Sequence, residues 1–235
     1  MGERFTFFTA KDIGDSKRKT ALERIFFHDI LNLASSIHMV IDLYSEGEID
    51  ELSDEVITML RRSSSDMMQE IEAFRALVSA EKNELIIQPK LLVSSDLIEE
   101  VAMLYKKSCE SHGMILEIKD GSLSAELSTD PSLLKRILIN MIKNAIEASG
   151  KGDIISVWCE KAEDGVVFKV NNPAVMTENV RIQIFKRSFT TKESGTGLGT
   201  YSMKLLSENY LGGSVDFSSK EGEGTTFKVF IPLSL

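Results

Sequence analysis

Residues 130–149 read DPSLLKRILINMIKNAIEAS and predict an apolar helix that carries two amide side chains. The helix is expected to begin at the aspartate–proline pair, a capping residue followed by proline at the first helical position, and to end near residue 149. Asn140 and Asn144 are four residues apart and therefore lie on one face of it. Burying an unpaired amide costs on the order of 1–3 kcal/mol, so both side chains need partners. Local hydrogen bonds would explain the two amides as well as a ligand-binding role would. Lys143 beside them, however, favours a phosphate or metal–phosphate ligand.

The residues around this helix predict a mixed domain of helices and strands. Strands are expected within 84–93, 114–119 and 124–129, a helix at 95–111, a strand hairpin at 153–171, a helix at 198–210 and two final strands within 213–233. Apolar and polar residues alternate in the hairpin, as is typical of half-buried antiparallel strands. The predicted fold class is an α+β sandwich with helices on one face of a sheet.

Two glycine-rich segments fall in this domain. The first, GTGLG at 195–199, leads into a helix, where glycines allow close backbone approach and the free N–H groups of the helix start suit an anion. It is neither a Walker loop nor a Rossmann fingerprint, because no Gly-Lys-Ser/Thr follows and no strand immediately precedes it. Lys186, Arg187 and Lys192 come just before it and suggest a mobile lid over phosphates. The second segment, GEGTTF at 222–227, is explained by a hairpin turn.

Residues 17–84 predict two long helices joined by the acidic segment SEGEIDELSDE. Their apolar residues recur three or four positions apart, which predicts an antiparallel helical hairpin. Each stripe is wider than one partner helix can cover, so we expect a symmetric dimer that closes a four-helix bundle; packing on the chain's own second domain is the alternative. The predicted division is a lead-in at 1–16, the hairpin at 17–84 and the second domain at 85–235. The first stripe contains Leu22, Phe26, Ile30, Leu33, Ile37, Val40 and Tyr44, and the second runs from Leu52 to Val78.

Charge and composition exclude several classes of protein. The 235 residues carry a net charge of −9, with 43% hydrophobic and 27% charged residues, as in ordinary globular proteins. The acid excess argues against non-specific binding of nucleic acid and against docking on an anionic membrane. Residues 1–84 hold 10 basic and 17 acidic groups, so the second domain keeps basic residues for an anionic ligand.

The chain is expected to be a cytoplasmic protein without a membrane segment. Cys109 and Cys159 form no C-x-x-C motif and no disulfide framework, which fits a reducing compartment. No apolar run approaches the roughly 18 residues that cross a bilayer, and the first residues do not form a secretory signal. A sensor domain, separate or missing from this sequence, would lie outside these residues.

A His-Asp pair occupies the first helix of the hairpin. His28 lies off the apolar stripe and is expected to be exposed, with Asp29 adjacent and Asn32 one turn further on. Most isolated exposed histidines are simply solvated. Here, however, a carboxylate can hold one ring nitrogen protonated and leave the other as a nucleophile. His38, which has no carboxylate beside it, and His112 are interpreted as structural.

Together these segments resemble the catalytic core of two-component sensor histidine kinases over nearly the whole chain. HDILN resembles the H-box of that family, NMIKNAIEA the N-box, IFKRSFTTK the F-box, and GTGLG and GEGTTF two of its glycine boxes. Their order and spacing agree with the family, which makes the combination far more specific than any single motif. The resemblance implies a dimerisation and histidine-phosphotransfer hairpin followed by an α/β sandwich of the Bergerat ATP-binding type.

The resemblance also implies a site for ATP and Mg²⁺ in the second domain. Asn144 would ligate Mg²⁺, and Lys143 and Lys192 would lie at the phosphates. The glycines of the first glycine segment would let the lid and the following helix approach the triphosphate. The implied nucleotide-binding residues are Asn140, Lys143, Asn144, Asn172, Lys192, Gly195, Thr196, Gly197, Leu198, Gly199 and Thr226.

One box departs from the family pattern. Where the family commonly has V-x-D-x-G-x-G, this chain has VNNPAVM at 170–176. Asn172 takes the place of the adenine-reading aspartate, and Ala174 that of a glycine. An amide oxygen still accepts from the adenine amino group but lacks the charge that strengthens such a bond, so weaker or less selective nucleotide binding is expected.

The implied reaction is transfer of the γ-phosphoryl group of ATP to His28 and onward transfer to an aspartate in the receiver domain of a response regulator. Asp29 would orient the ring and accept its proton. Asn32 would position the γ-phosphoryl group or, in the reverse direction, a hydrolytic water. The exposed face below His28, which includes Ser35, Ser36 and His38, is the expected docking surface.

Three alternatives remain from the sequence alone. A phosphatase or phosphotransferase with a weakened nucleotide site would fit the altered adenine box. An ATPase or anti-sigma-type kinase with the same nucleotide fold would not need a His-Asp pair on a separate hairpin. A pure dimerisation scaffold would leave the glycine and asparagine boxes without a role.

Overall fold

A computed structural model describes residues 14–47, 53–187, 189–190 and 197–235 of the chain. By the clustering of its contacts the chain forms two compact units, residues 1–74 and residues 75–235. Among the described residues, no helix is both long enough and apolar enough to span a bilayer.

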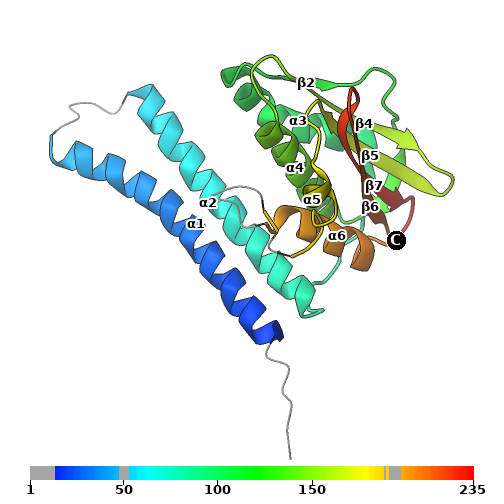
Figure 1. Cartoon of the computed structure of the whole chain (residues 1–235), viewed down its shortest axis with the longest axis horizontal. Helices are drawn as coiled ribbons and strands as arrows, with labels where there is room; N and C mark the ends of the chain where they lie inside the picture. Colours follow the sequence, from blue (N-terminus) through cyan, green and yellow to red (C-terminus); the bar gives the residue numbers. More distant parts are fainter. Residues whose placement is uncertain (1–13, 48–52, 188, 191–196) are drawn as a thin grey trace, which may run out of the picture. The chain divides into compact units, whose positions relative to one another are not determined.

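The first unit is built from α1 (Gly14–Ser45) and most of α2 (Asp54–Glu81), which run antiparallel (Figure 1). The prediction of two long helices is confirmed. Phe26 of the predicted stripe stacks on Phe74, with ring centroids 3.9 Å apart and an angle of 9° between the planes. Val40 is also buried, whereas Tyr44 at the end of α1 is largely exposed.

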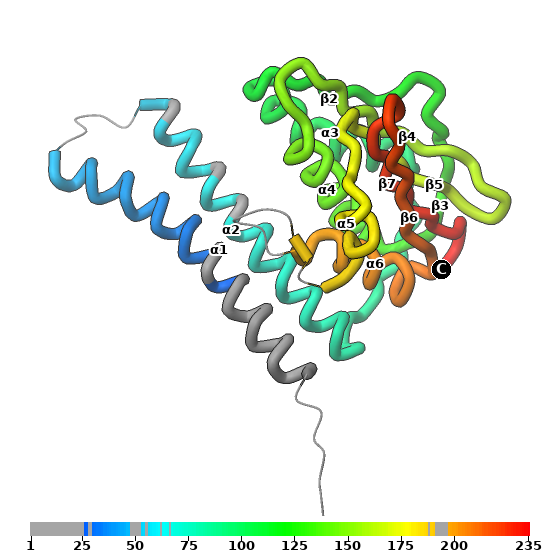
Figure 2. The backbone as a smooth tube through the Cα atoms, viewed as in Figure 1, coloured from blue at the N-terminus to red at the C-terminus, as the bar shows by residue number. Residues whose placement is uncertain are grey.

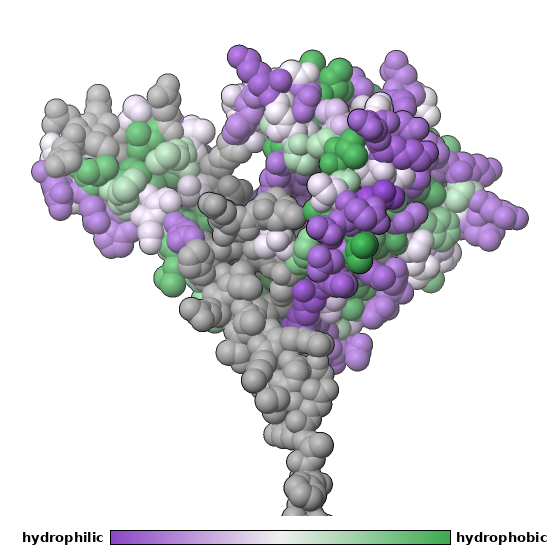
Figure 3. All heavy atoms as spheres, viewed as in Figure 1, coloured by the Kyte–Doolittle hydropathy of each residue, from purple (hydrophilic) through white to green (hydrophobic). Residues whose placement is uncertain are grey.

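A second set of apolar side chains on α1 is left in contact with solvent. Phe27 is 58% exposed, Leu31 is 64% exposed and Ile41 is 52% exposed. Spacings of four and ten residues place these positions on one side of the helix, next to the buried stripe. Hydrophobic side chains also reach the surface of this helical unit in the space-filling view (Figure 3).

The second unit contains a five-stranded sheet with the strand order β2-β4-β5-β7-β6 and a separate antiparallel pair, β1 with β3. In the larger sheet β2 and β4 are parallel and the other neighbours antiparallel. The strands are β1 (Lys90–Val93), β2 (Ile115–Ile118), β3 (Glu126–Thr129), β4 (Ile154–Lys161), β5 (Gly165–Asn172), β6 (Ser214–Lys220) and β7 (Gly224–Pro232).

Helices cover one face of this sheet, as the backbone tube in Figure 2 shows. They are α3 (Ser94–Ser111), α4 (Pro131–Ala148) and α6 (Gly199–Asn209). A one-turn helix, α5 (Glu178–Arg181), lies between β5 and α6, where the sequence predicts no helix or strand. Alternate residues of the central strands, such as Phe168 and Val229, are fully buried against the helices. The predicted α+β sandwich is confirmed.

The opposite face of the sheet is polar and aromatic. The ammonium groups of Lys119 and Lys169 lie 4.7 and 5.8 Å from the ring centre of Trp158. The indole N–H donates to Glu160 Oε1 over 2.7 Å. Hydrogen bonds from Lys169 and then Trp158 lower the pKa of Glu160, so this carboxylate stays charged to a lower pH than usual.

The start of α4 follows the sequence prediction. Asp130 Oδ1 accepts from the backbone N–H groups of Ser132 and Leu133, at 2.9 and 3.1 Å, and Pro131 is the first helical residue. The other carboxylate oxygen accepts from Gln88 N over 2.9 Å, which ties the helix start to the preceding segment. The cap therefore fixes where α4, and the two amides on it, begin.

The last turns of α2 pack with the second unit rather than the first. Leu77 and Ala80 are buried, and Tyr210 Oη donates to Ala80 O over 2.6 Å. Arg187 Nη2 lies 2.9 Å from Glu81 Oε2. These contacts place the boundary between the compact units at residues 74 and 75, inside α2, whereas the sequence suggested a division near residue 85.

Candidate active site

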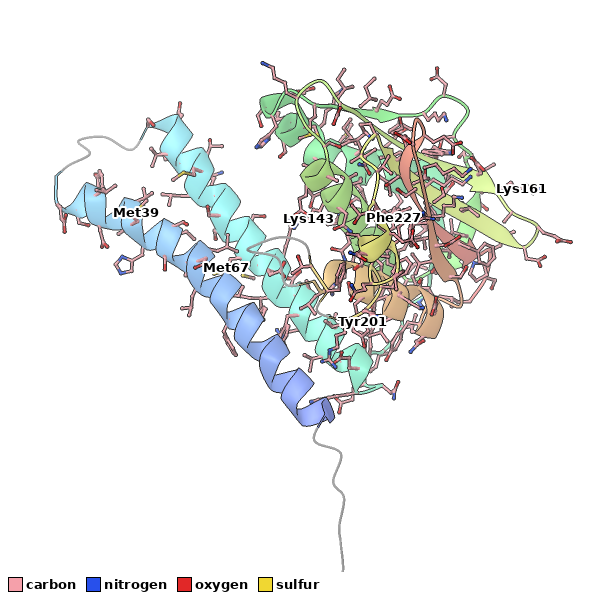
Figure 4. The ribbon with its side chains drawn as sticks, viewed as in Figure 1. Met39, Met67, Lys143, Lys161, Tyr201 and Phe227 are labelled. Atoms are coloured by element: carbon pink, nitrogen blue, oxygen red, sulfur yellow. The ribbon has the colours of Figure 1, made fainter. Side chains whose placement is uncertain are left out.

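The polar side of α4 presents the predicted residues together. Asn140, Lys143 and Asn144 are all half-buried, while Met141 and Ile142 on the other side of the helix are fully buried. Figure 4 labels Lys143 on this helix. Two amides and one ammonium therefore share a helical face at the edge of the apolar core.

Asn140 is satisfied within the protein. Its Nδ2 donates to Ser202 Oγ over 3.1 Å, and Ser202 Oγ donates to Gly199 O over 3.0 Å. This chain of hydrogen bonds joins α4 to the first turn of α6. The amide nitrogen of Asn140 is thus accounted for by a structural hydrogen bond, although to a distant residue and not to a local one as the alternative explanation expected.

Asn144 and Asn172 differ from Asn140. Each has a buried Nδ2 atom without a hydrogen-bond partner among the residues that the structure describes. An unsatisfied buried donor costs about 1–3 kcal/mol, and such groups in a native fold need an explanation. The two amides are therefore the best indication that the second unit has a ligand site on the helix-covered side of its sheet.

Asn172 is the last residue of β5 and is paired in register with Thr225 of β7. Thr225 Oγ1 donates to Ala174 O over 2.7 Å and lies 2.8 Å from Ser219 Oγ. Ser219 Oγ in turn accepts from Met176 N over 2.9 Å. These hydroxyls hold the segment after Asn172 against the ends of β6 and β7.

Thr226, which the resemblance implied as a nucleotide-binding residue, lies on the other face of the sheet. Its Oγ1 accepts from Asn171 Nδ2 over 2.9 Å, and Asn171 shares the outward side of β5 with Lys169. Because side chains alternate along a strand, Thr226 cannot share a face with Asn172. Thr225 does. The alternation with the apolar Phe227, two residues on, was the sequence signal that distinguishes the two threonines.

We expect the two threonines to differ in a nucleotide-binding assay. Thr225→Val removes the hydroxyl that holds Ala174 and Ser219, and should weaken nucleotide binding by about tenfold, the effect of roughly one hydrogen bond. Thr226→Val, the same change on the opposite face, should leave affinity within about twofold. Calorimetric titration with ATP measures both, and equal effects of the two variants would contradict the assignment.

Gly224 is required by a close approach as well as by its backbone conformation. It has a φ of +73°, and a Cβ atom here would lie 2.1 Å from Asn172 O and 2.7 Å from Pro173 Cα. The hairpin turn predicted for this segment is present, and it presses directly on the strand end that carries Asn172.

Gly224→Ala is therefore expected to destabilise the protein more than Gly222→Ala. Gly222 has a φ of +80° but nothing within 4 Å of a Cβ atom, so its substitution carries only the conformational cost of about 1–2 kcal/mol. The backbone collision at Gly224 should add about 2 kcal/mol, a typical cost of overpacking. Denaturant titration of both variants measures the difference, and equal free energies of unfolding would contradict it.

The first glycine segment lies partly within the described chain. Gly197 has a φ of +64°, and buried Leu198 is the N-cap of α6. A leucine side chain cannot accept from the first N–H groups of the helix, which leaves the helix start suited to an anion. The predicted residues Lys192, Gly195 and Thr196 lie outside the described residues.

Arg187, which the sequence suggested as part of a lid over phosphates, contacts other parts of the protein. Arg187 pairs with Glu81 and lies 5.8 Å from the ring centre of Tyr201. Burial, and then the charge of Glu81, raise the pKa of Tyr201. Arg187 is thus committed to α2 and α6, whereas Lys186 is exposed.

In the first unit, His28 and Asp29 lie within α1, and their side chains are not among those described. Asn32, Ser35 and Ser36 are exposed, as the docking-surface prediction requires. His38 is exposed too, but its Nδ1 lies 2.7 Å from Asp42 Oδ2. The expectation that His38 has no carboxylate partner was wrong because only sequence neighbours were considered, and residues four apart meet on a helix.

Residues 129–235 match the family described as histidine kinase-, DNA gyrase B-, and HSP90-like ATPase. These residues are therefore similar in sequence to ATPases of this family. The sensor histidine kinase ZraS of Escherichia coli (strain K12) is 28% identical over 218 residues, which cover 88% of this chain and 44% of ZraS. The chain thus spans less than half the length of this relative.

Solved histidine kinases share the fold. The nucleotide-free catalytic domain of the histidine kinase ThkA is 27% identical with a TM-score of 0.58, covering 63% of this chain and 97% of that domain. A crystal structure of ThkA in complex with the response regulator protein TrrA covers 94% of this chain and 62% of that chain, with 20% identity and a TM-score of 0.60. The comparisons thus show that the chain is similar, in sequence and in fold, to the catalytic cores of two-component histidine kinases.

The donor set of the second unit suits a metal ion held mainly by phosphate. The described residues contain no group of three or more histidine, cysteine or carboxylate side chains that could hold a metal. Mg²⁺ commonly keeps several waters and takes one or two protein ligands beside substrate phosphates. The Nδ2 of Asn144 has no hydrogen-bond partner among the described residues, and an amide oxygen is a ligand of the kind that Mg²⁺ takes.

Proposed function

We propose that this chain binds ATP with Mg²⁺ in residues 85–235 and transfers the γ-phosphoryl group to His28 in residues 17–84. The observation that supports this most strongly is the unsatisfied amide of Asn144 beside Lys143, in a domain similar in sequence to the ATPase family. Incubation with γ-labelled ATP tests it, because phosphohistidine is labile to acid and stable to base.

Within the nucleotide site each group has a distinct part. Asn144 offers its amide oxygen to Mg²⁺, and Lys143 and the N–H groups at the start of α6 bind phosphate oxygens. Mg²⁺ supplies neutralisation of phosphate charge when it is bound. Asn172 faces the base. Phosphoryl transfer needs little covalent help, so positioning and charge neutralisation account for the catalysis.

At the receiving end, one imidazole nitrogen of His28 forms a bond to the γ-phosphorus while the bond from that phosphorus to the β–γ bridging oxygen breaks and ADP leaves. Asp29 orients the ring and accepts the proton from its other nitrogen. Asn32, exposed on the next turn, positions the phosphoryl group or a hydrolytic water. The phosphohistidine is then a donor for an aspartate.

The acceptor we propose is the receiver domain of a response regulator. ThkA, which shares this fold, has been crystallised with a response regulator. Asn32, Ser35 and Ser36 form an exposed face of α1 where such a partner can reach His28. We place the reaction in the cytoplasm, where ATP is available and where the free Cys109 and Cys159 would stay reduced.

We further propose that the helical unit forms a homodimer. The support is the second apolar stripe of α1, with Phe27, Leu31 and Ile41 each more than half exposed in a single chain. Two copies that pack these stripes together complete a four-helix bundle.

Leu31→Glu is expected to weaken the dimer at least 100-fold, because an unpaired carboxylate would be buried at the centre of the apolar interface. Gln69→Glu, which adds the same charge at an exposed polar position of α2, is the matched control and should remain dimeric. Sedimentation velocity measures both, and a dimeric Leu31→Glu protein would remove this stripe from the interface.

A phosphatase or phosphotransferase with a weak nucleotide site is the second candidate function. The observation that favours it is Asn172, an uncharged amide at the position where the family has an aspartate. Titration with Mg-ATP separates the two, since a kinase must bind the nucleotide at cellular concentrations and this alternative need not.

A further inference from the structure

The side chain of Asn172 is buried and chemically uncommitted. It is 3% exposed, and its Nδ2 has no hydrogen-bond partner among the described residues. The neighbouring hydroxyls are already engaged, because Thr225 donates to Ala174 O and Ser219 pairs with Thr225. No side chain among these neighbours is left to pair with the amide, so a ligand is its natural partner.

Asn172 and Asn144 lie in contrasting electrostatic settings. Asn144 follows Lys143, a cation, so the α4 end of the site suits phosphate. Asn172 ends a strand whose other inward side chains are apolar, including Val170 and Phe168. An uncharged group with both donors and acceptors is the natural occupant there, which makes Asn172 a reader of the base.

We propose that Asn172 accepts guanine as well as adenine, so that the site takes purine nucleoside triphosphates of both kinds. This inference rests on the proposed function, the binding of a nucleoside triphosphate by this unit. Adenine presents a donor at position 6 and an acceptor at N1, whereas guanine presents an acceptor at position 6 and a donor at N1. A carboxamide pairs with either edge, because half a turn about its last side-chain bond exchanges oxygen and nitrogen.

A carboxylate at the same position would discriminate. Where it faces position 6 of the purine, it accepts from the amino group of adenine but repels the carbonyl oxygen of guanine, since an ionised carboxylate has no proton to donate there. The uncharged amide of Asn172 therefore determines base selectivity in this chain. The two purines should bind to the native chain with dissociation constants within tenfold of each other.

The test is calorimetric titration of the whole chain with Mg-ATP and Mg-GTP, for the native protein and for Asn172→Asp. The substitution should raise the preference for ATP over GTP at least tenfold, by loss of the donor to guanine and gain of a charge-assisted bond to adenine. Asn209→Asp makes the same change at an exposed position and should leave the preference unchanged.

The outcomes are distinguishable. If the native chain prefers ATP more than tenfold, or if Asn172→Asp does not shift the preference, this inference is overturned while the ATP site stands. If neither nucleotide binds, the proposed function fails as well. Circular dichroism shows whether Asn172→Asp folds. If it does not, the ratio of the dissociation constants of the native chain for Mg-ATP and Mg-GTP decides between these outcomes.

Discussion

His28→Ala should abolish acid-labile, base-stable labelling of the chain by γ-labelled ATP, a loss of at least about 1000-fold. The expectation follows from the chemistry, because without the imidazole there is no nitrogen at this position to bond to the γ-phosphorus. Nucleotide affinity should not change, since the binding groups lie in a different unit of the chain. Filter-bound radioactivity after base treatment measures the labelling.

The chain supplies its own controls, because it contains only three histidines. His38 also has a carboxylate partner, Asp42, and His112 Nδ1 lies 2.7 Å from Ser108 O. His38→Ala and His112→Ala should both retain labelling. Label that survives in His28→Ala but disappears in His38→Ala would move the phosphorylation site two to three turns along the same helix.

Asn144→Ala should reduce the affinity for Mg-ATP at least 100-fold and remove labelling, while the stability of the nucleotide-free protein stays the same or rises by about 1 kcal/mol. The substitution removes a buried donor that has no partner among the described residues, and alanine is the better helix former. A structural asparagine would behave in the opposite way. Titration with Mg-ATP and denaturant unfolding measure the two effects.

Two comparisons make the Asn144 result interpretable. Asn140→Ala should lower stability by about 1–2 kcal/mol, because it removes the hydrogen bond that Ser202 Oγ accepts from Asn140. Asn209→Ala, at an exposed position, should change neither stability nor affinity appreciably. Unchanged Mg-ATP binding in Asn144→Ala would exclude Asn144 from the site.

Features set by local chemistry could be predicted from the sequence. The aspartate–proline pair determines the start of α4 through bonds to residues two and three positions on, so Asp130 was identified correctly as its cap. The same holds for the helical periodicity of α1 and α2 and the alternation in β4 and β5. Each depends on neighbours that the printed sequence already shows.

Features set by contacts between distant residues could not be predicted from the sequence. Nothing near Asn140 shows that its amide binds Ser202, 62 residues away, or that Arg187 pairs with Glu81, 106 residues away. The two threonines are a different case, because the two-residue period of the strand, with apolar Phe227 on the inner face, already distinguishes Thr225 from Thr226.

The central claim is that the γ-phosphoryl group of ATP moves to the imidazole of His28. Tandem mass spectrometry of the native chain after incubation with Mg-ATP, with all steps kept at neutral or basic pH, tests it most directly. We expect a single phosphorylated peptide that contains His28, with the phosphoryl group on its imidazole ring. Phosphate found on a serine or threonine, or ATP hydrolysed with no phosphate on the protein, would contradict it.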